Sequence, residues 1–300
     1  MASITEFTKL IDPQVQAIFT TVLGERSMAD SIVNPVPPEA YTLTIGSHTG
    51  TGQTPTKDEG DDATAASPRQ GPTQTATHVV FSHLLQITRE LSQWDRFASV
   101  NKMVGSMAQG AMYTRESSVA NIFVRAFNSA YTGADSIELV SRVHTLYGAN
   151  GGTTPNEIAT TATALNPDTF EEIRLIFQNA VDDNGLLVQQ RPRFLLTGLT
   201  LGTRARTYCN TPLMPETANN DLNEMARGIA PIEWDLLPST TNYFLLGDKS
   251  SHDISRSVKQ TPTPRGPFVQ FRSENIEYAI AFEEIVFFVG WRGVAGAEGA

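Results

Sequence analysis

A long stretch without large hydrophobic side chains constrains this chain most. Residues 46–78 contain no Val, Ile, Leu, Met, Phe, Trp or Tyr and consist mainly of Gly, Thr, Ser, Pro, Ala and charged residues. Such a segment cannot bury a core of its own, and structureless loops of this length are uncommon inside compact domains. Strand-like sequences flank it at 41–45 and 79–87. Two interpretations stay open: an idle surface insertion, or a projecting two-stranded arm that becomes ordered on a neighbouring subunit.

The rest of the chain has the composition of an ordered globular protein. It has 300 residues, of which 40% are hydrophobic and 18% charged, and this length suits one large core or two modest domains. No apolar run approaches the roughly 20 residues of a membrane helix, and residues 1–10 lack the basic and apolar blocks of a signal peptide. The single cysteine, Cys209, cannot form an intramolecular disulfide, which suits folding in a reducing compartment.

The net charge of −10 limits how the chain can relate to nucleic acid. A protein that grips phosphates for affinity neutralises them with Lys and Arg and is therefore usually basic. Such a charge suits a surface that lies near nucleic acid without adhering to it, with nonspecific contact only.

Apolar spacing and end signals predict three helices. The first lies within 12–24, and its apolar stripe consists of Val15, Ile18, Phe19, Val22 and Leu23. A long helix is predicted from about 93 to 128, with its Met and aromatic stripe in the core. The third begins at the cap residue Asn166, has Pro167 in its first turn, and is stopped by 182–185.

The C-terminal third is predicted to be rich in strands. Residues 194–196 and 243–246 have the character of short buried strands, whereas 261–267 has the prolines of a connection. Residues 276–282 alternate apolar and polar positions like a half-buried strand, and 285–289 continue apolar on both faces. We therefore expect long strands at the end of the chain.

The sequence lacks the spacings of common catalytic and metal-binding motifs. No HExxH pair, zinc-type cysteine spacing, Walker A loop or nucleophile elbow is present. Gly50-Thr51-Gly52 lacks the third glycine of a dinucleotide fingerprint, because Pro55 holds that place, and is interpreted as a flexible loop. The adjacent Glu283 and Glu284 point to opposite faces of a strand and are poor candidates for an acid–base pair. We predict no enzyme, no catalytic residue, no cofactor and no metal.

A local basic cluster surrounds the strand at Phe194. It comprises Arg191, Arg193, Arg204 and Arg206. Aromatic residues at regular intervals, on which bases could stack, do not accompany it. Ion pairing with acidic neighbours is therefore the expected role of these arginines.

Several segments and their order carry a resemblance to a known family. A short N-terminal arm, a long polar hairpin, a long helix, a second helix and a strand-rich part follow one another. The segments with family-like sequence are 87–91, 182–185 with 191–196, 217–223, 242–248 and 290–293. In this respect the chain resembles the major capsid (head) proteins of tailed bacteriophages, including Mu-like prophage head subunits.

The resemblance implies an α+β Hong Kong 97-type capsid fold. Its expected parts are an N-terminal arm (1–40), an extended β-hairpin loop (41–90), a peripheral domain with the spine helix (91–185), an axial domain (186–267), and return strands of the peripheral domain with a C-terminal tail (268–300). The loop and the N-terminal arm would contact neighbouring subunits. The expected contact residues are Lys57, Asp58, Glu59, Asp61, Asp62 and Arg69 in the loop, and Val15, Ile18, Phe19 and Val22 in the N-terminal arm.

The resemblance also implies a function. Copies of the chain would assemble into hexamers and pentamers of an icosahedral shell that encloses double-stranded DNA in the virion, with assembly in the host cytoplasm. The portal protein and separate scaffolding and cement proteins are further expected partners, and no membrane is involved. Only residues 1–40 precede the hairpin, so a scaffold would be a separate protein or absent. Isopeptide crosslinking of Lys57 to Asn219 or Asn220 is not expected, because no catalytic glutamate aligns.

Three other interpretations remain open. An encapsulin-like compartment uses the same fold but packages enzymes. An enzyme of unknown type would require an acid–base or metal constellation, and a surface adhesin would require a secretion signal. Electron microscopy of the purified protein would separate these classes, since closed shells support the first two and enclosed nucleic acid distinguishes a phage head from an encapsulin.

Overall fold

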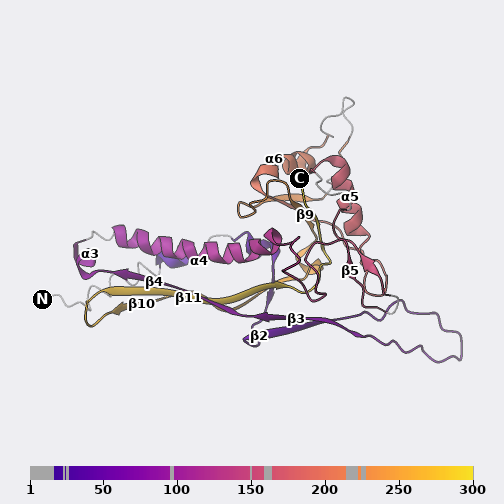
Figure 1. Ribbon diagram of the computed structural model, residues 1–300, viewed down its shortest axis with the longest axis horizontal. Coiled ribbons are helices and arrows are strands. Elements are labelled where there is room, and N and C mark those ends of the chain that lie inside the picture. The colour runs from indigo at the N-terminus through magenta and orange to yellow at the C-terminus, as the bar shows by residue number, and fades with distance from the viewer. Residues whose placement is uncertain are drawn as a thin grey trace.

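The computed structural model describes residues 17–22, 24, 27–94, 98–148, 151–158, 164–213, 222–223 and 228–299. They form a long sheet that lies beneath one long helix. A second sheet with two helices lies at one end of the long sheet, and a hairpin projects from this body (Figure 1).

The long sheet has the strand order β1-β10-β11-β4. Its strands are β1 (Asn34–Val36), β10 (Ile254–Val269), β11 (Ile276–Phe288) and β4 (Val79–Ile87). β11 pairs antiparallel with both β10 and β4, whereas β1 joins β10 in parallel. Tyr278, Ile280 and Phe282 are buried at every second position of β11. This confirms the half-buried strand predicted from the alternation at 276–282.

One long helix covers a face of this sheet. α4 (Ala98–Val124) follows the short α3 (Arg89–Trp94) and buries Val100, Val104 and Met107 in a core shared with β11. The single helix predicted from about 93 to 128 is therefore wrong in its bounds. Apolar spacing extends beyond the helix because Ala126 is buried in the turn that follows it.

β10 runs through the prolines of 261–267, so the connection predicted there is wrong. In the register of the sheet, Pro264 lies opposite Ile280 of β11. β1 pairs only with residues 255–257 of β10, which leaves the remaining length of that side as an edge. Proline lacks a backbone N–H and is tolerated on an edge strand, where that donor is not needed.

The hairpin consists of β2 (Thr42–His48) and β3 (Gln70–Thr77), paired antiparallel. The strands predicted at 41–45 and 79–87 are both present, but the second is β4 and pairs with β11, not with β2. The partner of β2 lies instead within the segment that lacks large hydrophobic residues. β3 fully buries only Ala76, so backbone pairing holds it and the apolar pattern could not reveal it.

The second sheet has the order β12-β9-β7-β8. Its strands are β12 (Val294–Ala297), β9 (Tyr243–Leu246), β7 (Phe194–Thr197) and β8 (Ala230–Glu233). Every residue of β9 and β12 is buried, as are three of the four in β7. The short buried strands predicted at 194–196 and 243–246 are confirmed.

Two helices share a core with this sheet, α5 (Pro167–Gln178) and α6 (Leu199–Asn210). The predicted start of α5 is confirmed: Thr169 N donates to the Asn166 side chain (2.8 Å), and Asn166 N donates to Thr169 Oγ1 (3.0 Å). This reciprocal cap satisfies backbone donors that the first turn leaves free. Phe170 and Ile173 of α5 are completely buried.

Shorter elements complete the described chain: α2 (Ala29–Ile32), β5 (His144–Thr145), β6 (Thr153–Thr154) and the 3-10 turn η1 (Lys249–Ser251). Among the described residues, no helix combines the length and the apolar character of a membrane-spanning helix.

The end of α4 and the second sheet share one core. Phe244 of β9 is 2% exposed, and its ring centroid lies 5.3 Å from that of Phe123 and 5.6 Å from that of Phe127. Phe123 also meets Trp234 edge to face at 6.3 Å. Such aromatic pairs contribute beyond the area that they bury. This cluster therefore joins the two halves of the molecule.

We predict that Phe244→Ala lowers the free energy of unfolding by about 3–5 kcal/mol, because it removes a fully buried ring and leaves a cavity. Urea unfolding of dissociated subunits measures this effect. The control is Phe271→Ala, since Phe271 is 99% exposed, and its effect should stay within about 0.5 kcal/mol. Equal losses in the two variants would contradict the shared aromatic core.

Candidate functional site

The projecting arm is defined as residues 42–77. A buried threonine closes it at the base of its tip, where the paired strands end. Thr49 is 3% exposed and its N–H donates to Arg69 O (2.9 Å), while Arg69 N donates back to Thr49 Oγ1 (2.8 Å). Ser47 Oγ donates to Pro72 O (3.1 Å). A Cβ at Gly71 would stand 2.4 Å from Ser47 Oγ, so any other residue there would displace that hydroxyl. The base is thus a fixed structure, although the segment has no core.

The arm is anchored to the body at two places. Leu43 and Ala76 share a small core with Phe287 of β11. At the base, Asn184 Nδ2 donates to Gly50 O (2.7 Å). Asn184 is itself held by Asp182, whose Oδ1 accepts its backbone N–H (2.9 Å). The 182–185 run is therefore a turn that supports the arm.

The arm tip, defined as residues 50–68, extends beyond the folded body (Figure 1). The predicted contact residues Lys57, Asp58, Glu59, Asp61 and Asp62 are all exposed and gather around a turn at Gly60, which has a φ of +91°. Arg69, the sixth, lies apart at the base. None of the six makes an ion pair with the described residues. The tip thus presents four carboxylates and one ammonium group without ion-pair partners among the described residues of its own subunit.

The predicted contact residues of the N-terminal arm are partly internal. Residues 17–22 are helical, and Gly24 N donates to Thr20 O (3.0 Å) at the helix end. Phe19 is 1% exposed in a core with β11 and α4, and Ile18 and Val22 pack against that core. Val15 lies outside the described residues. A role of these side chains in contacts between subunits stays a prediction.

A buried ionic cluster connects α4, the strands β10 and β11, and α2. Glu284 of β11 is 1% exposed, and its Oε2 lies 3.2 Å from Arg115 Nε of α4 and 3.8 Å from Arg256 Nε of β10. Arg256 Nη2 in turn lies 2.7 Å from Asp30 Oδ1 of α2. Burial raises the pKa of Glu284, and the two arginines oppose this by favouring its charged form.

The same end of α2 is held by a second carboxylate. Glu116 of α4 accepts from the Ala29 N–H (3.0 Å) and from the hydroxyl of Ser27. The sequence correctly separates the faces of Glu283 and Glu284, but it does not identify the role of Glu284. The available signal was a single charge on the buried face of an apolar strand, which requires a partner.

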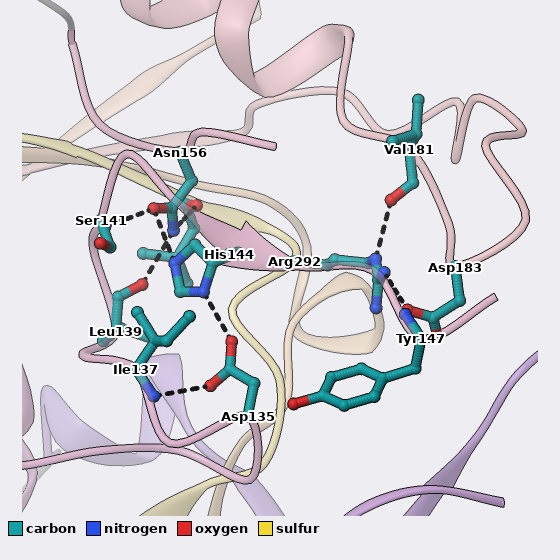
Figure 2. A network of polar contacts seen from close by, with 11 residues as sticks. Asp135, Ile137, Leu139, Ser141, His144, Tyr147, Asn156, Val181, Asp183 and Arg292 are labelled. Carbon is teal, nitrogen blue, oxygen red and sulfur yellow. Dashed lines mark hydrogen bonds and ion pairs between the residues drawn. The ribbon is translucent and has the colours of Figure 1, made fainter. Parts of the chain in front are cut away.

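A second polar network lies where the last turn of the chain meets the 131–158 loops (Figure 2). His144 is fully buried and stacks on Trp291 with ring centroids 4.6 Å apart. Its Nδ1 lies 2.7 Å from Asp135 Oδ2, and its Nε2 lies 3.1 Å from Asn156 Oδ1. The Asn156 amide donates to Leu139 O and to the carbonyl of residue 294, so its oxygen must face the imidazole. Both ring nitrogens of His144 therefore face side-chain oxygens.

This Asp–His pair is structural. An Asp–His dyad acts in catalysis when the far ring nitrogen faces a nucleophile, whereas here it faces the amide of Asn156, which holds backbone. On the other side of the network, Arg292 Nε donates to Val181 O (2.9 Å), and its Nη2 pairs with Asp183 Oδ1 (3.0 Å). Within the described residues, no group of three or more His, Cys, Asp or Glu side chains could hold a metal ion.

His252 is a buried histidine with one unsatisfied ring nitrogen among the described residues. It is 4% exposed, and its Nδ1 has no hydrogen-bond partner within the described chain. Burial lowers its pKa to about 4, and the positive charge of the nearby Lys249 acts in the same direction. The folded subunit therefore holds His252 neutral.

We predict that Glu284→Gln destabilises the subunit by about 3 kcal/mol or more, because it leaves Arg115 and Arg256 buried without their shared counter-charge. The matched control is Glu283→Gln, one residue away and half-buried, which should change the free energy of unfolding by less than about 0.5 kcal/mol. Both are measured by urea unfolding at neutral pH. Similar values for the two variants would rule out the cluster as a stabilising element.

We predict that acid destabilises the subunit through His252. Its pKa is lower folded than unfolded, so between pH 6.5 and about 4 the unfolded chain binds more protons and stability falls as the pH falls. The loss should be on the order of 3 kcal/mol. In His252→Gln, unfolding should depend less on pH across this window, whereas His83→Gln, which removes an exposed histidine, should follow the wild type. Parallel pH curves for all three proteins would refute this.

Comparison with solved structures places the fold among viral shells and related compartments. The procapsid protein of bacteriophage JBD30 is 12% identical, with a TM-score of 0.57 over 100% of this chain and 77% of that chain. The capsid protein of Cyanophage P-SCSP1u is 11% identical, with a TM-score of 0.57 over 92% and 88%. The SrpI encapsulin complex from Synechococcus elongatus PCC 7942 is 13% identical, with a TM-score of 0.50 over 89% and 84%. At such identities the likeness establishes the fold alone.

Comparison at the sequence level separates these possibilities. The comparison with curated proteins finds no match. The family model described as phage capsid protein matches residues 72–297, from β3 through the spine helix and both sheets to β12. That span is most of the chain, and the predicted α+β Hong Kong 97-type fold is confirmed. The chain therefore belongs to the phage capsid protein family, as a structural protein and not an enzyme.

Proposed function

We propose that this phage capsid protein is the major head subunit of a tailed bacteriophage, whose copies form hexamers and pentamers of an icosahedral shell around double-stranded DNA. One observation supports this most: the arm has a fixed base but a tip whose charges have no partner in the described part of the same subunit. The charges of the tip add no ion pair to the described part of a monomer. They gain a role when a neighbouring copy lies beneath the tip.

The strength of such contacts comes from repetition. An exposed ion pair contributes only about 0–1 kcal/mol, so one arm adds little to one interface. In a closed shell every subunit both gives and receives an arm, and many weak contacts then act together. This arithmetic favours an assembly protein over a monomeric binding module.

The two sheets correspond to the two proposed domains. The long sheet with α4 would form the peripheral domain, and the second sheet with α5 and α6 the axial domain. The boundaries at 186 and 267 stay predictions. The contacts of α5 with the second sheet, and of β10 with the long sheet, favour a division by sheet membership over one by continuous sequence.

The remaining partners and the location are also proposals. A portal protein and separate scaffolding or cement proteins would contact the shell in the virion, after assembly in the host cytoplasm. Contact with packaged DNA would be nonspecific, because a subunit of net charge −10 is repelled overall by the phosphates of DNA.

An encapsulin-like compartment is the second candidate, because the SrpI encapsulin has a similar fold. The family model favours the phage head. Electron microscopy of particles purified from the producing cells separates the two, since nuclease-protected double-stranded DNA inside closed shells supports a phage head and packaged enzyme supports a compartment.

We predict that replacing residues 51–68 with a short Gly-Ser turn leaves a folded subunit but blocks or weakens shells. Thr49 and Arg69, which close the base, are retained, so the thermal unfolding of the subunit should be unchanged. Sedimentation and electron microscopy measure assembly. A control variant with a Gly-Ser tip of native length separates the reach of the tip from its charges. If the shortened variant formed shells of normal size and heat resistance, the tip would be an idle insertion.

A further inference from the structure

Positive charge is concentrated in one stretch of this acidic chain. From residue 184 to 215 there is no Asp or Glu, and the stretch contains Arg191, Arg193, Arg204 and Arg206. Arg206 is already neutralised by Glu233, at 2.7 Å. Arg191 and Arg193, in contrast, make no ion pair with the described residues.

These two arginines line a groove of about 760 Å³ between the end of α5 and the start of β7. We call it the arginine groove. It is lined by Arg174, Gln178, Gln190, Arg191, Arg193 and Ile229, among others. It holds three guanidinium groups, and Arg174 alone has an acidic partner among the described residues, Glu171 Oε1 at 2.6 Å.

The backbone fixes how the groove presents its charges. Arg193 N donates to Leu246 O (2.8 Å) and Arg193 O accepts from Ala230 N (2.8 Å), so this residue is held between β9 and β8. Pro192 is buried, whereas Arg191 and Arg193 on either side of it are exposed. In extended backbone, side chains two residues apart lie on the same face. The two guanidinium groups are therefore presented together.

Two further groups in the groove lack partners. The buried Nε of Arg174 and the Oε1 of Gln190 have no hydrogen-bond partner within the described chain, while Gln190 Nε2 is fixed by Ser251 O (2.8 Å). Planar guanidinium groups in a fixed arrangement suit carboxylates, which they bind through paired hydrogen bonds. The groove is thus a prepared anion site without an anion from its own described chain.

We propose that the arginine groove binds the arm tip of an adjacent copy. The guanidinium groups pair with the carboxylates of the tip, which are those of Asp58, Glu59, Asp61 and Asp62. This inference rests on the proposed function, because it names the surface that receives the arm in the shell.

The two surfaces are complementary in charge and in accessibility. The tip holds four exposed carboxylates within residues 58–62, and none has an ion-pair partner among the described residues of its subunit. With roughly ten residues on each side of Gly60, the tip can reach about 35 Å from its base. It therefore extends far enough to meet a neighbour, while its base stays fixed to Asn184.

Charge reversal tests the pairing. One variant carries Arg191→Glu and Arg193→Glu, a second carries Asp58→Lys and Asp61→Lys, and a third combines all four. Each of the first two should lower the yield of shells about tenfold or more at moderate salt, and the combined variant should recover most of it. The control carries Arg204→Glu and Arg272→Glu, which make the same change in net charge at exposed sites outside the groove. Its yield should match the wild type, and circular dichroism checks that every variant is folded.

Crosslinking provides a test that does not depend on closed shells. In a Cys209→Ser background, subunits with Asp61→Cys are mixed with tagged subunits that carry Arg193→Cys. A disulfide-linked dimer of one tagged and one untagged chain is expected, and a mixture with Arg204→Cys in place of Arg193→Cys should give none. Equal crosslinking to both positions would overturn the proposal, whether or not shells form.

The outcomes also separate this inference from the proposed function. If the wild type forms DNA-filled shells and the groove variant assembles equally well, the proposed function stands and the pairing is wrong. If the groove variant assembles normally but loses binding of a short DNA duplex that the wild type retains, the groove is a phosphate site and the proposal is overturned. If the groove variant and the tip variant each lose assembly and the variant that combines all four substitutions recovers it, the pairing is established.

Discussion

The antiparallel pairing of β10 and β11 is the interaction on which the rest of the structure depends. β11 has α4 packed against Tyr278, Ile280 and Phe282 on one face and the stem of the arm against Phe287 on the other. Because strand side chains alternate, one strand can serve both neighbours without conflict. A shift of register by a single residue would exchange the two faces and expose both contacts at once.

Glu284 makes that register specific. It continues the α4-facing series of Tyr278, Ile280 and Phe282, so the slip that would expose the aromatic residues would also withdraw its carboxylate from Arg115 and Arg256. A buried ion pair contributes little net stability compared with apolar residues, but an unpaired buried charge is strongly unfavourable. The cluster therefore penalises wrong pairings more than it stabilises the right one.

The sequence predicted those elements in which local chemistry and burial agree. The alternation along β11, the short apolar runs of β7 and β9, and the Asn166 cap of α5 each state one structure without reference to distant residues. β3 could not be predicted in this way, since its residues are compatible with a loop and only pairing with β2 makes them a strand. The prolines of β10 misled for a related reason, because whether a strand is an edge is decided by its neighbours.

The candidate site shows the same division between local and distant information. The charges of the arm tip were evident from composition. The sequence predicted acidic neighbours for Arg191, Arg193, Arg204 and Arg206, and among the described residues the fold provides one only for Arg206, which is Glu233. Which of these charges is neutralised depends on the contact between α6 and β8, and no local pattern encodes it.

Segregated charge on one subunit also determines what kind of assembly it can form. Two acidic tips repel each other, and so do two arginine grooves, so contacts between identical surfaces are disfavoured. Contact between a tip and a groove joins two different surfaces of the chain. After the first contact, one subunit still has a free groove and the other still has a free tip. Such head-to-tail contacts form closed rings when the rotation between copies permits it. The acidic tip and the basic groove thus disfavour contacts between like surfaces and are compatible with rings, the units from which the proposed shell is built.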